Sequence, residues 1–325
     1  IQSEIDQLTT EIDRVAETTK FNESYLLKGD ADGATKDVYM NGHDAGLKGT
    51  LTDGATTATF KVAAGALDAG KKVTIGGKEY TIGSTKTEAE ALATKAETDA
   101  AAATADKTIK IDGDEYTYDQ ANTKWKDKDG QDVADIKAKI KAGSTVEYNG
   151  KSLTVMNDAG ADGVDDSDSS VISADKAKTL MTAELTTANN IGATKTAATI
   201  AAGTAYDSAT GATFTINKGT AEVAEKLNFN LHVGSDADMT NKINVNIETM
   251  NSSYLGIKGL NVSDDTGVAA TYAVDAIADA LQKVSDQRSS LGAVQNRLEH
   301  TIDNLDNVVE NTTAAESRIR DTDMA

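Results

Sequence analysis

The chain has 325 residues, and its 52 acidic and 32 basic side chains give a formal net charge of −20. It contains no cysteine, which excludes a disulfide framework and a thiolate metal site. The negative charge argues against a nucleic-acid partner, because the phosphate backbone would be repelled. No stretch of about 18 uncharged apolar residues is present, so we expect no membrane partner. At roughly 150 residues per domain, the length predicts about two domains.

The start of the chain has the apolar spacing of a coiled-coil helix. Apolar side chains recur at alternating intervals of four and three residues, at Ile1, Ile5, Leu8, Ile12 and Val15. We predict a helix that fades at Thr18–Thr19 and is followed by a turn at Phe21–Asn22. Because this pattern is already under way at Ile1, and no Met start or signal peptide precedes it, we expect an internal fragment.

The last quarter of the chain carries a longer version of the same pattern. Its seam consists of Ile277, Leu281, Val284, Arg288, Leu291, Gln295, Leu298, Ile302, Leu305 and Val309. The two polar members, Arg288 and Gln295, can fix register and partner choice. Residues 272–320 predict one helix roughly 70 Å long. The N-terminal helix is too short to cover it, so we expect the rest of the stripe to pack against missing sequence or other subunits.

The middle of the chain contains a repeated strand–turn–strand pattern. Alternating segments flank Gly-Gly, Asp-Gly or Asn-Gly dipeptides in residues 73–82, 109–118 and 146–155. A looser fourth hairpin covers residues 204–218, and a helix is expected after each hairpin, at residues 87–105, 131–142, 173–189 and 220–227. The middle therefore predicts about four β-β-α units, with the acidic run 157–169 as a solvated loop.

A further pair of strands is predicted before the long C-terminal helix. Residues 229–250 alternate again, with apolar side chains at Phe229 and Leu231 and then at Ile243 and Val245. The two strands would be joined across residues 234–241.

Both ends of the chain resemble bacterial flagellin. The motifs are Ile1–Ile5 (IQSEI), Glu11–Arg14 (EIDR) and Thr19–Leu27 (TKFNESYLL) at the start, and Arg288–Leu298 (RSSLGAVQNRL) and Ala314–Arg320 (AAESRIR) near the end. They lie within residues 1–28 and 227–325, about two-fifths of the chain. The resemblance implies an α+β protein with a discontinuous long-helix coiled-coil rod and a β-hairpin, formed by these two segments. Residues 29–226 would be an inserted, surface-exposed outer domain of β-β-α units.

The resemblance also implies a function. Flagellin is the structural subunit of the bacterial flagellar filament, so we expect an extracellular protein that polymerises with other flagellin subunits for motility. Export through the flagellar type III apparatus, an export chaperone and the filament cap are implied as well, and the absence of Cys and Pro is compatible with export of an unfolded chain. The innermost terminal helices of the family would lie outside this sequence. The insertion precedes the 229–247 strand pair, whereas in many flagellins it follows this hairpin.

The resemblance assigns two groups of site residues. Flagellin rods are ligands of Toll-like receptor 5, and the carried-over contacts are Glu4, with Ile1 and Gln7 beside it, and Arg297 in the Gln-Asn-Arg motif. The alternative interpretation is that Glu4 is a solvated flank of the seam. The second group consists of residues expected to pack the rod or its subunits: Ile5, Leu8, Ile12, Arg288, Leu291, Gln295, Leu298, Ile302 and Leu305.

The sequence offers no enzyme, cofactor or metal site. The three His residues are scattered, and no His-Glu-x-x-His motif is present. Residues 127–130 and 30–33 resemble the start of a Ca²⁺ loop, but Ala138 and Asn41 stand where the loop requires a bidentate Glu, so both are interpreted as Asp-Gly turns. Trp125 is interpreted as a core residue. Two other functions stay open: a hook–filament junction protein, and an outer domain that acts as a displayed adhesin or glycan-binding module.

Overall fold

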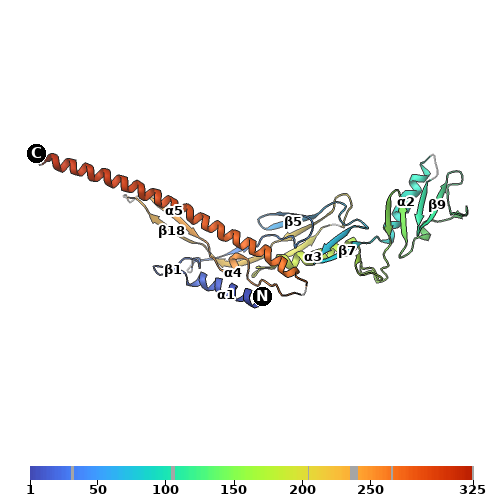
Figure 1. The fold of residues 1–325 in the computed structure, drawn as a ribbon, viewed down its shortest axis with the longest axis horizontal. Coiled ribbons are helices and arrows are strands. Elements are labelled where there is room, and N and C mark those ends of the chain that lie inside the picture. The colour runs from blue at the N-terminus through green and yellow to red at the C-terminus, as the bar shows by residue number, and fades with distance from the viewer. Residues whose placement is uncertain (31–32, 104–106, 204, 235–240, 265, 324–325) are drawn as a thin grey trace.

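The computed structural model describes residues 1–30, 33–103, 107–203, 205–234, 241–264 and 266–323. The molecule is elongated (Figure 1): helix α5 (Val268–Asp323) extends to one end, and a lobe that contains helix α2 (Lys86–Ala101) lies at the other. Between them lies a second lobe with helix α3 (Ala174–Asn189). We call residues 33–84 and 156–226 the inner lobe and residues 85–155 the outer lobe.

Both predicted terminal helices are confirmed. Helix α1 spans Gln2–Thr18, and α5 has 56 residues, which at about 1.5 Å per residue is a length of about 84 Å. The turn predicted after α1 is the tip of a small hairpin of β1 (Lys20–Phe21) and β2 (Ser24–Tyr25). Its central residues have positive φ angles, as a two-residue hairpin turn of this hand requires.

The three repeated hairpins are confirmed, and each turns on the expected dipeptide. Both residues of every turn have positive φ, which Gly, Asn and Asp tolerate best. The strand pairs are β6 (Lys72–Ile75) with β7 (Lys78–Ile82), β8 (Thr108–Ile111) with β9 (Asp114–Asp119), and β12 (Thr145–Tyr148) with β13 (Lys151–Thr154).

The inner lobe combines three small sheets with α3. Their strand orders are β15-β16-β5-β4, β14-β7-β6 and β17-β3, and β14 pairs with β7 in parallel. The core includes Phe60, Phe214 and Leu185, all fully buried. The strands not yet given are β3 (Thr35–Tyr39), β4 (Thr50–Asp53), β5 (Thr57–Val62), β14 (Val171–Ile172), β15 (Thr199–Ala202), β16 (Ala212–Asn217) and β17 (Thr220–Ala224).

The outer lobe is one six-stranded sheet covered by α2. The order is β11-β10-β9-β8-β12-β13, where β10 is Lys124–Lys126 and β11 is Asp132–Val133. Helix α2 begins at a capping box of Thr85 and Glu88, and its buried alanines allow it to lie close to the sheet. Trp125 is 3% exposed and packs edge-on against Tyr118, so its interpretation as a core residue is confirmed.

Two of the four helices expected in the middle are wrong. Residues 131–142 form β11 and a short 3₁₀ turn (Lys137–Lys139), because Val133 pairs with Trp125 while Ile136 and Ile140 enter the core. Residues 220–227 begin with β17, whose Thr220, Ala221 and Val223 are buried against β3. Both segments are too short for a stable helix without favourable packing, and sheet pairing dominates.

Other expectations for the middle are met or shifted. Helices α2 and α3 lie where two of the four helices were expected, and residues 157–169 contain no strand or helix among the described elements. The fourth hairpin is shifted, because β16 pairs with β15, which ends before residue 204. A run of four equal β-β-α units is therefore wrong, since strands from different hairpins share sheets.

The rod contains α1, α5 and the chain that leads into α5. Strands β18 (Leu227–His232) and β19 (Lys242–Ile247) confirm the predicted pair; the middle of their connection lies outside the described residues. After the short helix α4 (Ser252–Leu255), Leu255 and Leu260 pack against Ala273 and Ala276 of α5.

Candidate assembly surfaces

Helix α1 is attached to the segment after α4. The Gln2 side chain donates to the carbonyl of Leu260 (3.0 Å) and accepts from the N–H of Val262 (2.8 Å). Ile5 and Ile12 pack against the cluster of Leu255 and Leu260. By contrast, Leu8 is 64% exposed, so the chain does not bury the predicted seam of α1 as a coiled coil would.

An apolar groove of about 250 Å³ runs between α1 and α5. Its walls are Ile5, Leu8, Thr9 and Ile12 on one side, Ile277, Ala280, Leu281 and Val284 on the other, and Leu255, Ile257 and Leu260 at its base. Leu8 and Leu281 on opposite walls are each about two-thirds exposed. Such a concentration of apolar side chains at the surface is typical of an interaction site.

Beyond the groove, the seam of α5 continues with partial cover. Strand β19 contacts this part of the helix, where Gln287 donates to the carbonyl of Asn246 (3.1 Å) and accepts from the N–H of Glu248 (3.1 Å). Leu291, Leu298 and Leu305 are half-buried, and Arg288, Gln295 and Ile302 are exposed. Val309 and Ile319 are 62% and 74% exposed. The apolar stripe is thus present on the helix surface toward its C-terminal end.

The residues carried over as receptor contacts lie in two places. Ile1, Glu4 and Gln7 are exposed and follow one another at helical intervals on α1, so they share one face. Arg297 is also exposed, but the apolar cluster that attaches α1 to α5 extends on α5 from Ala273 to Val284. Arg297 lies about 20 Å further along the axis, at about 1.5 Å per residue. The structure brings the first three together and leaves Arg297 apart.

Sequence reasoning missed the polar contacts around the start of α5. Tyr272 donates a hydrogen bond to Glu184 of α3, and burial raises the pKa of the Tyr272 hydroxyl. Lys283 donates to the carbonyl of Tyr254 (2.7 Å), and burial lowers the pKa of its ammonium group. Each pair joins separate segments of the chain, so no local sequence pattern predicts it.

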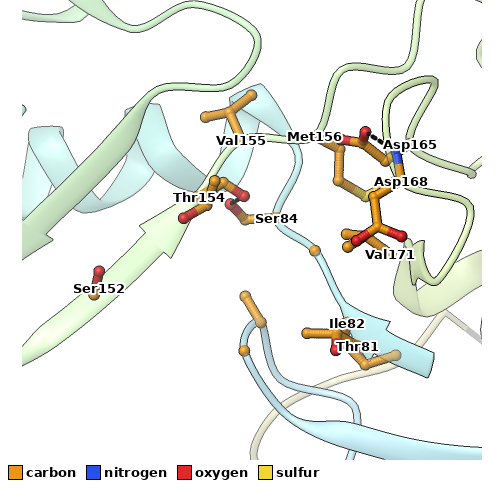
Figure 2. A pocket seen from close by; sticks show the side chains of 13 residues that line it. Thr81, Ile82, Ser84, Ser152, Thr154, Val155, Met156, Asp165, Asp168 and Val171 are labelled. Carbon is orange, nitrogen blue, oxygen red and sulfur yellow. Dashed lines mark hydrogen bonds between the residues drawn. The ribbon is translucent and has the colours of Figure 1, made fainter. Parts of the chain in front are cut away.

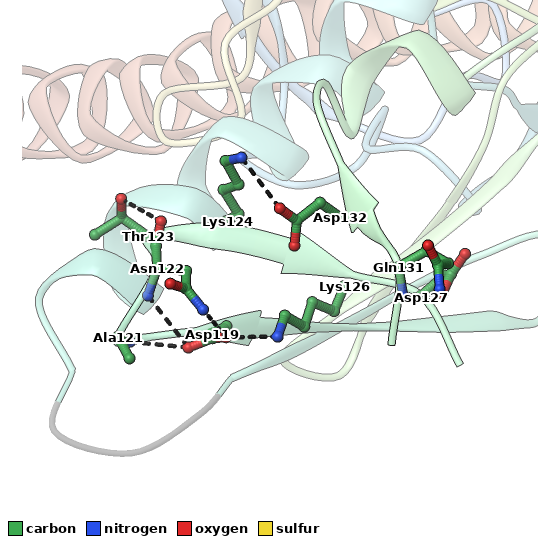
Figure 3. A network of polar contacts seen from close by, with 9 residues as sticks. All are labelled: Asp119, Ala121, Asn122, Thr123, Lys124, Lys126, Asp127, Gln131 and Asp132. Carbon is green, nitrogen blue, oxygen red and sulfur yellow. Dashed lines mark hydrogen bonds and ion pairs between the residues drawn. The ribbon is translucent and has the colours of Figure 1, made fainter. Parts of the chain in front are cut away.

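Asp side chains in the acidic turns accept hydrogen bonds from backbone N–H groups. Asp127 accepts hydrogen bonds from the N–H groups of Asp129 (3.0 Å) and Gln131 (2.8 Å), which confirms the Asp-Gly turn. Figure 3 shows Asp127 next to Gln131. Nearby, the ion pair with Lys126 (2.8 Å) holds the pKa of Asp119 well below its usual range. The 30–33 turn includes residues outside the described part.

The described residues offer neither a metal-binding cluster nor a helix suited to a membrane. In that part of the chain no group of three or more His, Asp or Glu side chains could hold a metal ion. No helix there combines the length and the apolar character that a membrane crossing demands.

Comparison with known proteins finds similarity to flagellins. The family model "Bacterial flagellin C-terminal helical region" matches residues 274–325. The chain is 50% identical over 97 residues to the protein YvzB of Bacillus subtilis (strain 168), and 41% identical over 126 residues to a flagellin of the same organism. The chain is thus similar to bacterial flagellins, and its C-terminal segment matches their family model. A third relative, the flagellar filament core protein flaB2 of Brachyspira hyodysenteriae, is 45% identical over 112 residues.

These matches cover only part of each chain. They span 30%, 33% and 34% of the chain, and 59%, 41% and 38% of the three relatives. The flagellin family is structural and non-enzymatic.

Proposed function

We propose that the chain is a structural subunit of a bacterial flagellar filament, an extracellular polymer in which it packs against other flagellin subunits. The observation that carries the proposal is the apolar surface of the rod: the groove between α1 and α5, and the exposed stripe from Ile302 to Ile319. A 56-residue helix with such a stripe is suited to burial against neighbouring subunits. A relative named as a flagellar filament core protein supports the same function.

The rest of the assembly route belongs to this proposal. Export through the flagellar type III apparatus with a chaperone, and addition beneath the filament cap, both require a chain that unfolds and refolds readily. The absence of disulfides and of Pro supports this requirement, because prolyl isomerisation is a slow folding step.

The test is electron microscopy of filaments from a bacterium that lacks its own flagellin and expresses the full-length protein that contains this chain. We expect Ile302→Asp to abolish or shorten the filaments, because it places a charge in the stripe. Asn304→Asp adds the same charge at an exposed position outside the seam and should leave them intact. Normal filaments from the Ile302 variant would contradict the role of the stripe, and absence of filaments from the unmodified protein would contradict the function.

We also propose that the exposed face of α1 contacts Toll-like receptor 5 through Ile1, Glu4 and Gln7, with Arg297 as a separate contact on α5. The exposure of all four side chains supports this assignment. In receptor-reporter cells, Glu4→Ala and Arg297→Ala should lower activation, whereas Asp6→Ala, an exposed acidic residue on a different face of α1, should not. Equal activation by all three variants would contradict the carry-over.

A further inference from the structure

The first turns of α5 belong to two hydrophobic cores at once. Tyr272 is 3% exposed and lies in the inner-lobe core, with Val268 packed beside it. Its neighbour Ala273 and, one turn later, Ala276 lie in the rod core with Leu255. Successive helix residues point about 100° apart, so one helix can serve both cores. Neither core can lose this segment without exposing apolar surface.

Polar and backbone contacts reinforce this junction between inner lobe and rod. Tyr272 donates to Glu184 of α3. The Asn189 amide, at the end of α3, bonds both the N–H and the carbonyl of His43 at 2.9 Å, and His43 Nε2 lies 3.5 Å from Asp279 of α5.

A glycine allows the two parts to meet closely. A Cβ atom at Gly192 would lie 2.5 Å from the carbonyl oxygen of Gly256 in the rod, so only a glycine fits there. The inner lobe is therefore held to the rod by apolar packing, hydrogen bonds and direct backbone contact.

The outer lobe is joined to the inner lobe in a different way. The chain crosses between the lobes at Ser84 and Val155, which form an isolated parallel bridge. The backbone N–H and the hydroxyl of Ser84 both donate to the carbonyl of Thr154, at 3.2 and 2.7 Å (Figure 2). Two cavities flank the crossing: one of about 450 Å³ next to Ser84, and an open one of about 560 Å³ lined by Tyr206 and Tyr148 from opposite lobes.

The cores on either side of the crossing are separate. The outer-lobe core includes Trp125, Tyr118 and Ile136, and from the inner lobe Ala69 packs against it. A small side chain such as Ala buries little apolar area, so it couples the two cores weakly.

We propose that the chain consists of two cooperative units whose boundary lies at Ser84 and Val155. One unit contains the rod and the inner lobe, locked together by the start of α5. The other is the outer lobe, residues 85–155, which unfolds on its own. The boundary thus falls inside the segment expected to be the insertion, rather than at its ends. This inference is independent of the proposed function.

The chain carries a built-in probe for each unit. Trp125 is the single Trp of the sequence and lies in the outer-lobe core, so its fluorescence reports that lobe. Far-UV circular dichroism reports mainly the other unit, because α1, α3 and α5 have 17, 16 and 56 residues against 16 in α2. In urea titrations of the whole chain, the two signals should follow different unfolding curves.

The fluorescence and dichroism midpoints of the unmodified chain could coincide by chance even if the two units unfold separately. Three variants therefore shift one unit at a time. Tyr272→Phe and Glu184→Leu remove the junction hydrogen bond and should shift the dichroism curve alone. Tyr148→Phe removes the bond to Asp99 within the outer lobe (3.0 Å) and should shift the fluorescence curve alone. Each unfolding equilibrium should change about five- to thirty-fold.

Two outcomes overturn the proposal. If every variant moves both curves together, the chain is one cooperative unit. If the dichroism curve divides into separate inner-lobe and rod transitions, and Glu184→Leu affects one of them only, α5 does not lock these parts together.

Discussion

Asp13 and Ser252 are 239 positions apart in the chain, yet the Asp13 carboxylate accepts hydrogen bonds from both the backbone N–H and the hydroxyl of Ser252, at 2.7 and 2.8 Å. Ser252 is 1% exposed and is the first residue of α4. The adjacent Asn251 caps the same helix by accepting from the N–H of Tyr254 (2.8 Å). One carboxylate of α1 therefore satisfies a buried helix end and fixes α1 to the rod.

Replacement of Asp13 should loosen α1. The Asp13→Ala variant leaves two buried donors of Ser252 without their acceptor, which costs roughly 1–3 kcal/mol. We expect a lower urea midpoint by circular dichroism. Glu17→Ala, which removes an exposed carboxylate from α1, is the control and should change the midpoint little. If both variants unfold at the same urea concentration, the Asp13 contact contributes nothing to stability.

The elements that sequence patterns predicted well are those with local causes. The three hairpins follow from Gly76–Gly77, Asp112–Gly113 and Asn149–Gly150, because a two-residue turn needs residues that accept positive φ. Both terminal helices follow from apolar periodicity over many turns. The helix expected at residues 220–227 fails because β17 pairs with the distant strand β3, which no local pattern encodes. The helix expected at residues 131–142 fails because Val133 pairs with Trp125 of the neighbouring strand β10.

The candidate surfaces were predicted only in part. The heptad pattern located the seam, but it did not show that the α4 segment lies between α1 and α5, which leaves Leu8 and Leu281 at the surface. The hydrogen bond between Tyr272 and Glu184 joins residues 88 positions apart, so the local apolar periodicity could not predict it.

A substitution in the exposed groove should affect assembly, whereas one in the buried rod core should affect folding. Leu281 is 65% exposed, so Leu281→Asp should leave the melting temperature nearly unchanged while it weakens filament formation. Ala276 is 3% exposed in the rod core, and Ala276→Asp should unfold the rod because it buries an unpaired charge. Calorimetry and electron microscopy of both variants give the comparison. Strong destabilisation by Leu281→Asp would show that the groove is part of the folded core.

Gly192 tests the close contact between inner lobe and rod. Its φ is +75°, and a Cβ would collide with the backbone of Gly256. Gly192→Ala therefore introduces both backbone strain and a steric clash. Backbone strain alone costs about 1–3 kcal/mol, and we expect the variant to lose more than this. Gly259 has φ +78° and open space around it, so Gly259→Ala measures the strain alone. Equal destabilisation of the two variants in urea would contradict the close contact.

Alkaline conditions should weaken the fold through the partly buried Tyr206 and the buried Tyr272. Burial, together with the hydrogen bond to Asp68 (2.8 Å), raises the pKa of Tyr206 from 10 to about 12. Burial also raises the pKa of Tyr272. A pKa that is higher in the folded than in the unfolded chain contributes stability that is fully present below the unfolded value. This contribution is lost as the pH rises through the folded value. We therefore expect stability to fall between pH 10 and 12.

The Tyr206→Phe variant isolates the contribution of one phenol. It cannot ionise at this position, so its stability should fall less steeply between pH 10 and 12 than that of the unmodified chain. Phenolate absorbance should show one fewer late-titrating tyrosine. Tyr39→Phe, at an exposed position, is the matched control and should leave the slope unchanged. Parallel pH profiles for the unmodified chain and the Tyr206 variant would show that Tyr206 ionises alike in the folded and unfolded chain, which its burial beside Asp68 argues against.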